Sequence, residues 1–364
     1  MRLFIITYLC LSFLSFSFAK DKGVDGLLLW KMHKDVPAQI IPVRTGETKV
    51  GAAQRYLKTL QIHPELKKLF NNSTFDVRMV NFDNIEFLDI DEVKHSKKVS
   101  ILLLSNYLND LVPKYWRPLT FIRPLRFFGA NTFMLAPAAD VGLSRKDAVT
   151  FRKMVITTFD AILSLGGDDV HPALYGEKVT YSYLNQINLA RDKAELRMIR
   201  AFNKEERGVF YGICRGSQLC AVERGGKLIQ DLKQEQKVVQ DHWLKIHELN
   251  IDSKSKNILN RFVSDPVIDI LSAHHQALVP GTAKVKPIAF YGKGSEFVVE
   301  GWQLPNNLGL GLQFHPELFA ENSDNEKILK GMVQYASFIK SQRKSSENIC
   351  KQSLKRLLDR NPLN

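Results

Sequence analysis

The sequence predicts an α/β protein whose mostly parallel central sheet is flanked by helices. The first observation is a continuous apolar run at residues 99–104, which is typical of a strand buried on both faces. The second is an alternation of segments with strand and helix character: strand 99–104, helix 121–128, strand 132–135, strand 161–165, helix 189–202, strand 208–213, helix 215–224 and a closing helix 324–340. Such alternation indicates a parallel sheet with helices on its faces.

Composition is ordinary for a globular protein and excludes several classes. The chain has 364 residues, of which 45% are hydrophobic and 24% are charged. These fractions argue against disorder, collagen and coiled coil, and the length suits one large α/β domain with an accessory segment, or two modest domains. The formal net charge of +13 favours anionic ligands. Because the basic residues are scattered, without a basic helix or a basic-aromatic motif, no binding of nucleic acid is expected.

Residues 1–19 have the pattern of a secretory signal peptide. A positive start at Arg2 precedes an apolar stretch at 3–16, and small residues at the end of the segment suit cleavage after Ala19. A buried helix or a membrane anchor is the alternative, but the stretch is short for a membrane span and no other segment approaches the required length. The sequence therefore predicts an exported protein, periplasmic or secreted, or lysosomal or extracellular in a eukaryote.

Three regions are predicted after the signal. Residues 20–97 form an N-terminal extension of unknown role, with a short helix expected at 52–60 and a strand at 75–82. Residues 98–340 carry the alternation of strands and helices and form the main domain. The tail at 341–364 is basic and polar, and could continue as a frayed helix.

Three cysteines remain after signal cleavage, namely Cys214, Cys220 and Cys350. An odd number in an exported protein leaves at least one free thiol. A disulfide between Cys220 and Cys350 would leave Cys214 reactive, and the absence of any disulfide is equally compatible with the sequence.

A strand-to-helix turn at residues 212–216 predicts a cysteine nucleophile. Its sequence is Gly-Ile-Cys-Arg-Gly, the G-x-nucleophile-x-G elbow with Cys214 in the central place. The tight, strained turn requires small residues on both sides and projects the thiol from the carboxyl edge of the sheet. The N–H of Arg215, at the start of the helix, can face an oxyanion. A buried structural cysteine beside a turn is the alternative.

A histidine and a carboxylate follow the apolar run at 308–314. His315 and Glu317 are two residues apart, and residues i and i+2 on a strand face the same side, so Glu317 can orient His315. A cysteine, a histidine and a carboxylate that orients it are the parts of thiol acyl transfer. A surface His-Pro turn is the alternative.

A Gly-Gly-Asp-Asp sequence follows the strand at 161–165. Glycines at a strand end let the backbone approach a ligand closely, and the N–H of Gly167 is expected as a second oxyanion donor. The alternative is a plain loop in which Asp168 or Asp169 caps a helix.

Several histidines occur late in the chain and raise the question of zinc. They are His242, His247, His274 and His275. Their spacings match neither a zinc finger nor an H-E-x-x-H site, so no metal and no cofactor are expected. These side chains are predicted to line a pocket instead.

Five ordered motifs are shared with one known family. They lie at residues 166–177, 191–195, 212–218 with its continuation at 225–232, 272–276, and 313–317. In this order and spacing the chain resembles the class I glutamine-amidotransferase-like peptidases of the C26 type, which include γ-glutamyl-γ-aminobutyrate hydrolase. The resemblance covers residues 98–340 and implies a flavodoxin-like, three-layer hydrolase domain.

The resemblance also implies a set of site residues and a reaction. The implied triad is Cys214, His315 and Glu317. The implied oxyanion donors are the N–H groups at Gly167 and Arg215, and the residues expected near the substrate are Gly166, Gln218 and His274. The implied reaction is hydrolysis of a small γ-glutamyl amide through a thioester. Whether the protein forms a homodimer is left open by the sequence.

Two positions depart from the family pattern. Ala221 and Leu271 stand where the family usually has asparagine, which leaves the amine side of the substrate undetermined. Poly-γ-glutamate (folate) hydrolase is the second expectation, although the nucleophile motif of those enzymes carries other residues than Ile213 and Arg215. A glutamine amidotransferase subunit and a non-catalytic γ-glutamyl-binding protein are the remaining alternatives.

Overall fold

The computed structural model describes residues 23–31, 38–64, 66, 82–104, 117–181, 187–238, 242–318 and 323–359, and of residues 348–359 it describes the backbone alone. The predicted signal peptide, most of the predicted strand at 75–82 and the side chain of Cys350 lie outside this part of the chain. What the sequence predicts of them stays a prediction.

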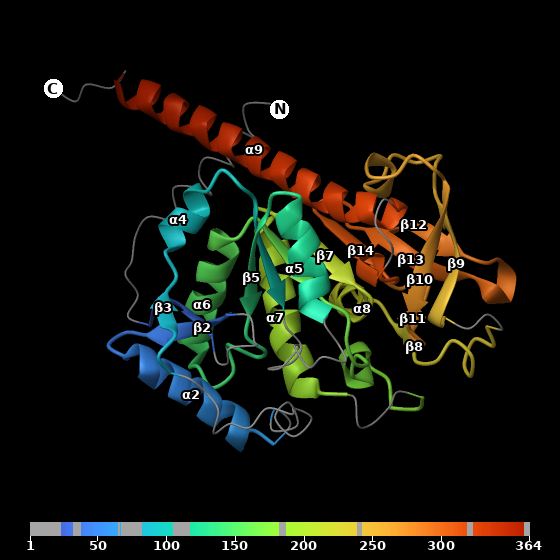
Figure 1. Cartoon of the computed structure of the whole chain (residues 1–364), viewed down its shortest axis with the longest axis horizontal. Coiled ribbons are helices and arrows are strands. Elements are labelled where there is room, and N and C mark those ends of the chain that lie inside the picture. Colours follow the sequence, from blue (N-terminus) through green and yellow to red (C-terminus); the bar gives the residue numbers. More distant parts are fainter. Residues whose placement is uncertain are drawn as a thin grey trace.

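Twelve strands of the described residues form one mixed sheet (Figure 1). Its central block is parallel and consists, in spatial order, of β14 (Gly309–Leu312), β7 (Val209–Ile213), β6 (Ala161–Ser164), β4 (Ser100–Leu104), β5 (Asn131–Leu135) and β2 (Gln39–Arg44). The predicted fold class, with a mostly parallel central sheet, is confirmed.

Antiparallel strands extend this block at both ends. Beyond β14 lie β13 (Val298–Gln303), β12 (Lys286–Tyr291), β9 (Trp243–Ile251) and β10 (Val267–Ala273). Beyond β2 lie β1 (Val24–Trp30) and β3 (Ile85–Phe87). A separate small sheet pairs β8 (Leu228–Ile229) with β11 (Ala277–Leu278).

Helices cover both faces of the parallel block, as the alternation along β4 shows. Leu102 and Leu104 join a core that includes residues of α2 (Lys49–Ile62), α6 (Arg145–Thr158), α7 (Leu189–Glu205) and α8 (Arg215–Glu223). Ile101 and Leu103 join a second core with residues of α5 (Arg117–Phe127) and α9 (Asp324–Asp359). Successive side chains of a strand point to opposite faces, so the continuous apolar run marks a strand buried on both sides.

The described part of residues 20–97 packs against the same sheet. Its strands β1 and β3 extend the sheet beyond β2, and helix α2 contains the helix predicted at 52–60. The short helix α4 (Ile90–His95) precedes β4. These residues thus contribute to the main core, in which Trp30 and Tyr56 are fully buried.

Helix α9 continues from the expected segment at 324–340 through most of the tail to Asp359, as the sequence allowed. Buried charge fixes its middle. The Lys340 ammonium lies 2.7 Å from Asp160 Oδ2, and the Arg343 guanidinium lies 2.6 Å from Asp160 Oδ1. Although α9 is long, none of the helices in the described ranges combines the length and apolar character needed to cross a membrane.

Candidate active site

Cys214 occupies a strained turn between β7 and α8. Its backbone has φ +49° and ψ −111°, a conformation that costs energy for any residue with a Cβ. Its N–H donates to the carbonyl of Leu312 at 2.7 Å, and its carbonyl accepts from the N–H of Gln218 at 3.1 Å. The turn is therefore held from the neighbouring strand and from the first turn of the helix.

The two glycines of the elbow are required by space. A Cβ at Gly212 would stand 2.7 Å from the nitrogen of Ser217, and one at Gly216 would stand 2.1 Å from the carbonyl oxygen of Ser164. Both contacts are to backbone atoms, which cannot rotate away. The predicted reason for the spacing around Cys214, a tight turn against the sheet, agrees with these contacts.

His315 and Glu317 form a close pair just beyond β14. His315 Nδ1 lies 2.7 Å from Glu317 Oε1, and the His315 N–H donates to the carbonyl of Leu271 at 3.0 Å. The sequence prediction placed this pair on a strand, with both side chains on one side. The structure differs, since β14 ends at Leu312 and residues Pro316–Leu318 form a turn of 3-10 helix. That turn, and not strand alternation, brings the carboxylate to the imidazole.

The electrostatics of this pair favour a protonated imidazole. Burial lowers the pKa of His315, but the Glu317 carboxylate and the Cys214 thiol outweigh it and raise the pKa to about 10. The imidazole is thus surrounded by two groups that stabilise its charged form. Such a pair is the arrangement that an acyl-transfer cysteine requires of its base.

Gly166, just beyond the end of β6, lies beside Cys214 and His315. A Cβ built on it would stand 2.9 Å from His315 Cε1 and 3.5 Å from Cys214 Cβ. The ends of β6, β7 and β14 therefore meet at one edge of the sheet, where open α/β sheets bind ligands. Gly167 follows directly and is half-buried. The expected oxyanion roles of the Gly167 and Arg215 N–H groups stay predictions.

The Arg215 side chain turns toward helix α7. It is buried, with its guanidinium 2.5 Å from Asp192 Oδ1 and 2.7 Å from Glu195 Oε2. Burial lowers its pKa, but Glu195 and Asp192 raise it more, so the net shift is upward. Arg191 extends the network, since it lies 3.3 Å from Asp192 and 3.5 Å from Asp168. This ion network ties the elbow and the Gly-Gly-Asp-Asp loop to α7. The sequence did not predict it.

Gln218, expected near the substrate, is buried in the first turns of α8. Its Nε2 donates to the carbonyl of Gln276 at 3.0 Å and to Gln313 Oε1 at 3.2 Å. The amide therefore links α8 to the segment after β10 and to the strand end that carries His315. Its predicted contact with substrate is untested.

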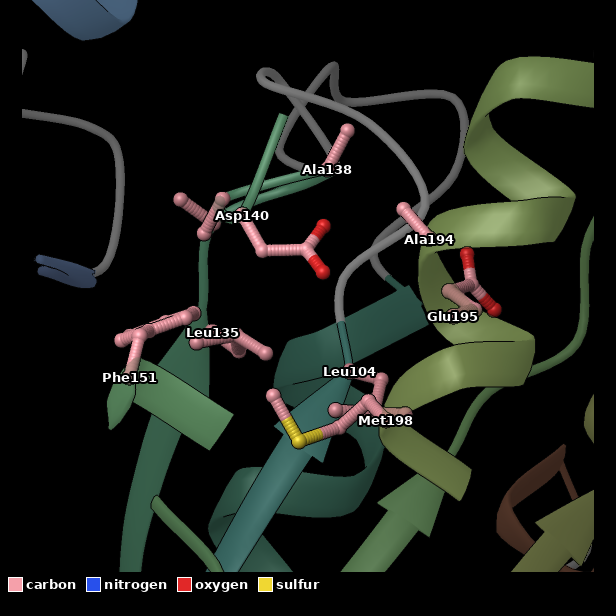
Figure 2. Close-up of a pocket in the computed structure, with 10 residues that line it drawn as sticks. Leu104, Leu135, Ala138, Asp140, Phe151, Ala194, Glu195 and Met198 are labelled. Atoms are coloured by element: carbon pink, nitrogen blue, oxygen red, sulfur yellow. The ribbon is translucent and has the colours of Figure 1, made fainter. Parts of the chain in front are cut away.

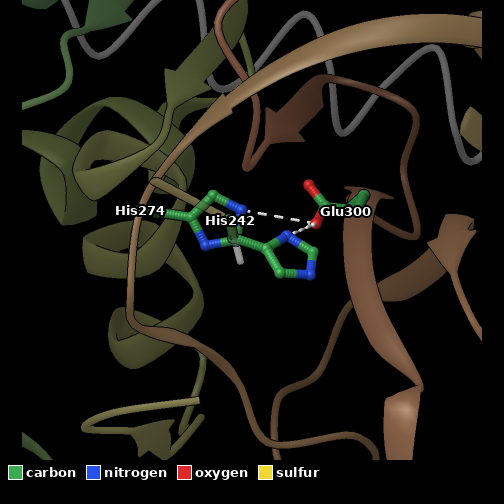
Figure 3. A group of neighbouring side chains, drawn as sticks. All are labelled: His242, His274 and Glu300. Atoms are coloured by element: carbon green, nitrogen blue, oxygen red, sulfur yellow. Dashed lines mark ion pairs between the residues drawn. The ribbon is translucent and has the colours of Figure 1, made fainter. Parts of the chain in front are cut away.

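His274, also expected near the substrate, lies in a buried cluster on the antiparallel side of the sheet. Its Nε2 is 3.3 Å from Glu300 Oε1, and His242 Nδ1 is 3.2 Å from the same oxygen (Figure 3). Burial lowers the pKa of His274, while Glu300 opposes this shift. Within the described ranges these three residues form a group that could hold a metal ion. Both histidines are among those that the sequence singles out, whereas Glu300 stands within an apolar strand and carries no such signal.

The neighbouring His275 points instead to the Gly-Gly-Asp-Asp loop. Its Nε2 lies 2.8 Å from Asp169 Oδ1 and its Nδ1 lies 3.4 Å from Asp231 Oδ2. Burial lowers its pKa, but the two carboxylates raise it more. These contacts of His275 connect three of the five motifs and stabilise the loop that begins with Gly166.

Cys220, six residues beyond the elbow, is a different kind of cysteine. It is a buried free thiol in the structure, contacted by Asn203 Nδ2 at 3.5 Å. Burial raises its pKa to about 12, so it stays a neutral thiol at physiological pH. The side chain of Cys350 lies outside the described residues, so both sequence alternatives for a Cys220–Cys350 disulfide stay open.

A small apolar pocket lies along the same edge of the sheet, beyond the ends of β4 and β5 (Figure 2). Leu104, Leu135, Phe151 and Met198 contribute its apolar walls. Glu195 also lines it, so one carboxylate both borders this pocket and holds Arg215. Cys214, His315 and Gly166 are not among the residues that line this pocket.

Comparisons with known proteins point to one family. The family model for peptidase C26 matches residues 134–317 of this chain, a range that includes all three residues of the predicted triad. Protein NtpR of Enterococcus hirae is 33% identical over 190 residues, which are 49% of this chain and 76% of that protein. The glutamine amidotransferase-like protein YvdE of Lactococcus lactis is 29% identical over 181 residues, which are 48% of this chain and 73% of that protein.

The chain is also similar to solved structures. The glutaminase domain of Trypanosoma brucei CTPS with bound acivicin has a TM-score of 0.48 and 14% sequence identity, and the match covers 65% of this chain and 94% of that one.

Proposed function

Because the chain belongs to the peptidase C26 family, we propose that it hydrolyses γ-glutamyl amide bonds through a thioester on Cys214. One observation carries this proposal. The Glu317 carboxylate lies 2.7 Å from the His315 imidazole, and that imidazole and Cys214 both lie against Gly166. A cysteine at a strained turn with an oriented base matches the requirements of thiol acyl transfer.

The first half of the reaction forms the thioester. With its proton transferred to His315, Cys214 attacks the side-chain carbonyl carbon of the γ-glutamyl group, and a tetrahedral oxyanion results. The N–H groups of Gly167 and Arg215 are the proposed donors to that oxyanion. The carbon–nitrogen bond then breaks, and His315 gives its proton to the departing amine.

The second half releases glutamate. A water molecule gives a proton to His315 and attacks the thioester carbonyl, and the thiolate of Cys214 leaves. Glu317 stabilises the imidazolium in both halves, as the raised pKa of His315 supports. The proton that water gives to His315 replaces the one that left with the amine, and the pair of Cys214 thiolate and His315 imidazolium is restored, so no cofactor is required by this scheme.

We also propose that the protein works outside the cytoplasm. This proposal rests on the signal-like pattern of residues 1–19. After export the chain would act as a periplasmic or secreted hydrolase on a small γ-glutamyl compound. Mass spectrometry of the mature protein tests the proposal, because its N-terminus would then be Lys20 and not Met1.

A second candidate is hydrolysis of glutamine itself, as in an amidotransferase subunit. The observation in its favour is the likeness to the YvdE protein, whose name describes it as glutamine amidotransferase-like. The two positions that depart from the family pattern do not decide between these substrates. Ala221 is buried inside α8, and Leu271 contributes its carbonyl to His315.

A substrate screen separates these candidates. Purified protein is incubated with glutamine, γ-glutamyl amides, γ-glutamyl peptides and poly-γ-glutamate, and released glutamate, amine and ammonia are measured. We expect glutamate and amine from at least one γ-glutamyl amide, and none from the Cys214→Ala variant. Ammonia from glutamine alone would favour the second candidate. Identical traces from wild type and Cys214→Ala on every substrate would overturn both.

A further inference from the structure

The cluster of His242, His274 and Glu300 has an unusual chemical property: it is fully buried and rich in unsatisfied polar atoms. Its side chains come from the residue before β9, the residue after β10 and the middle of β13, and they converge in the interior (Figure 3). They are at most 1% exposed. Their potential ligand atoms all lie within 4.8 Å of one another.

The tautomer of His274 leaves two lone pairs facing each other. Its Nδ1 lies 3.0 Å from the carbonyl oxygen of Gln276, which can only accept, so Nδ1 carries the proton. In the neutral ring Nε2 is then a bare acceptor, and it faces Glu300 Oε1 at 3.3 Å. Two acceptors in contact require either a second proton on the imidazole or a metal cation between them.

Hydrogen bonding among the described residues does not resolve this arrangement. His274 Nε2, both ring nitrogens of His242 and both carboxylate oxygens of Glu300 lack a hydrogen-bond partner there. Buried polar atoms without partners are costly and rare. The nearby His247 makes the contrast clear, because its Nδ1 bonds the Glu248 carbonyl at 3.0 Å and its Nε2 bonds Ser272 Oγ at 2.7 Å.

Two of the three ligand separations fit a tetrahedral metal site, and the third is within 4.8 Å. Ligand atoms around zinc, at bond lengths near 2.0–2.2 Å, stand about 3.3–3.6 Å apart in a tetrahedral site. The two measured separations to Glu300 Oε1 are 3.2 Å from His242 and 3.3 Å from His274. The Gln276 carbonyl on the far side of His274 also supplies the outer hydrogen bond that metal-binding histidines commonly make.

We propose that His242 Nδ1, His274 Nε2 and the Glu300 carboxylate bind a zinc ion. Two imidazoles and one carboxylate are a donor set that zinc takes in proteins, with a fourth position completed by a water molecule. Because the cluster is buried, the ion enters while the chain folds. The ion joins β13 to the segments that flank β9 and β10. This link orders the region next to the end of β14, where His315 lies.

The link to the active site runs through one carbonyl. The Gln276 oxygen accepts from His274 Nδ1 at 3.0 Å and from Gln218 Nε2 at 3.0 Å. Gln218 in turn donates to Gln313, two residues before His315. The zinc ion is therefore a structural ion that supports the region around the triad, and no step of the reaction passes through it.

Metal content of the full mature chain tests this proposal without any activity assay. The protein is produced with zinc present, passed over a chelating resin and analysed by mass spectrometry of the metal. We expect about one zinc per chain in the wild type and below about 0.1 in Glu300→Gln and His274→Gln. His95→Ala, which changes an exposed histidine on α4, is the matched control and should keep the ion.

Cys214→Ala is the control for zinc bound at the triad, where a cysteine, an imidazole and a carboxylate also lie close together. We expect this variant to keep its zinc. X-ray absorption at the zinc edge of the wild type gives the ligand set even where a cluster variant fails to fold, and should show two imidazoles and no sulfur. Wild type without zinc, loss of zinc in Cys214→Ala, or a sulfur ligand would each overturn the proposal, and the first would show a buried imidazolium–carboxylate group instead.

Discussion

Gly166 and His315 are in contact, and the contact leaves no room for a side chain. A Cβ at position 166 would stand 2.9 Å from His315 Cε1 and 3.7 Å from its Nε2. The glycine thus fixes where the imidazole can lie relative to Cys214. This contact joins two motifs that are about 150 residues apart in the sequence.

Gly166→Ala is expected to reduce kcat about 100-fold with little change in stability. The added methyl group displaces the His315 ring, and a displacement near 1 Å is enough for a loss of this size. The control is Gly26→Ala, where a Cβ meets its nearest neighbour at an ordinary 3.5 Å. Steady-state kinetics on the substrate found in the screen measure the effect. Equal kcat values in the two variants would contradict the proposed position of His315.

Glu317→Gln should lower kcat by about 10² to 10⁴, because the amide no longer stabilises the imidazolium.

Glu317→Gln should also change the pH dependence of stability. The pKa of His315 is raised from 6.5 to about 10 in the folded state, so its contribution is complete below pH 6.5 and is lost as the pH rises toward 10. Urea unfolding between pH 6 and 10 should therefore show a decline that is smaller in Glu317→Gln. A parallel decline in both proteins would contradict this source of the shift.

The sequence predicts the strands of the parallel block other than β2, and the place of Cys214, Gly166 and His315 at its edge, because these depend on local signals. Apolar runs mark buried strands, and polar or glycine residues mark their ends. The ion network of Arg215 is not visible in this way. Asp192 and Glu195 are three residues apart on α7, as in many exposed helices, and only tertiary packing makes them buried.

Glu300 illustrates the same limit for the antiparallel strands. Its neighbours in β13 are apolar or small, and nothing near it in the chain indicates a histidine partner. His242 and His274 reach it only because β9, β12 and β13 pair in that order, with β10 at the edge. Long-range pairing of this kind is a property of the whole sheet, not of a motif.

Arg215→Met should destabilise the protein by about 3–5 kcal/mol, because it leaves the buried Glu195 carboxylate without its ion-pair partner and leaves Asp192 with Arg191 alone. Arg200→Met is the matched control, since Arg200 is 60% exposed and its pair with Glu223 is at the surface. That change should cost less than about 1 kcal/mol. Urea unfolding at pH 7 measures both. A cost below 1 kcal/mol for Arg215→Met would show that the ion network does not stabilise the elbow.

Alkylation should distinguish the two cysteines near the elbow. Iodoacetamide at pH 7 is expected to modify Cys214 at least about 100-fold faster than Cys220, whose buried thiol has its pKa raised to about 12 and is almost entirely protonated. Trypsin cleaves after Arg215, so the two cysteines fall on separate peptides that mass spectrometry can quantify. In urea both should react at similar rates. A Cys214 that reacts as slowly as Cys220 in the folded protein would favour a non-catalytic protein of the same fold, because the thiol attack that the mechanism requires would then be absent.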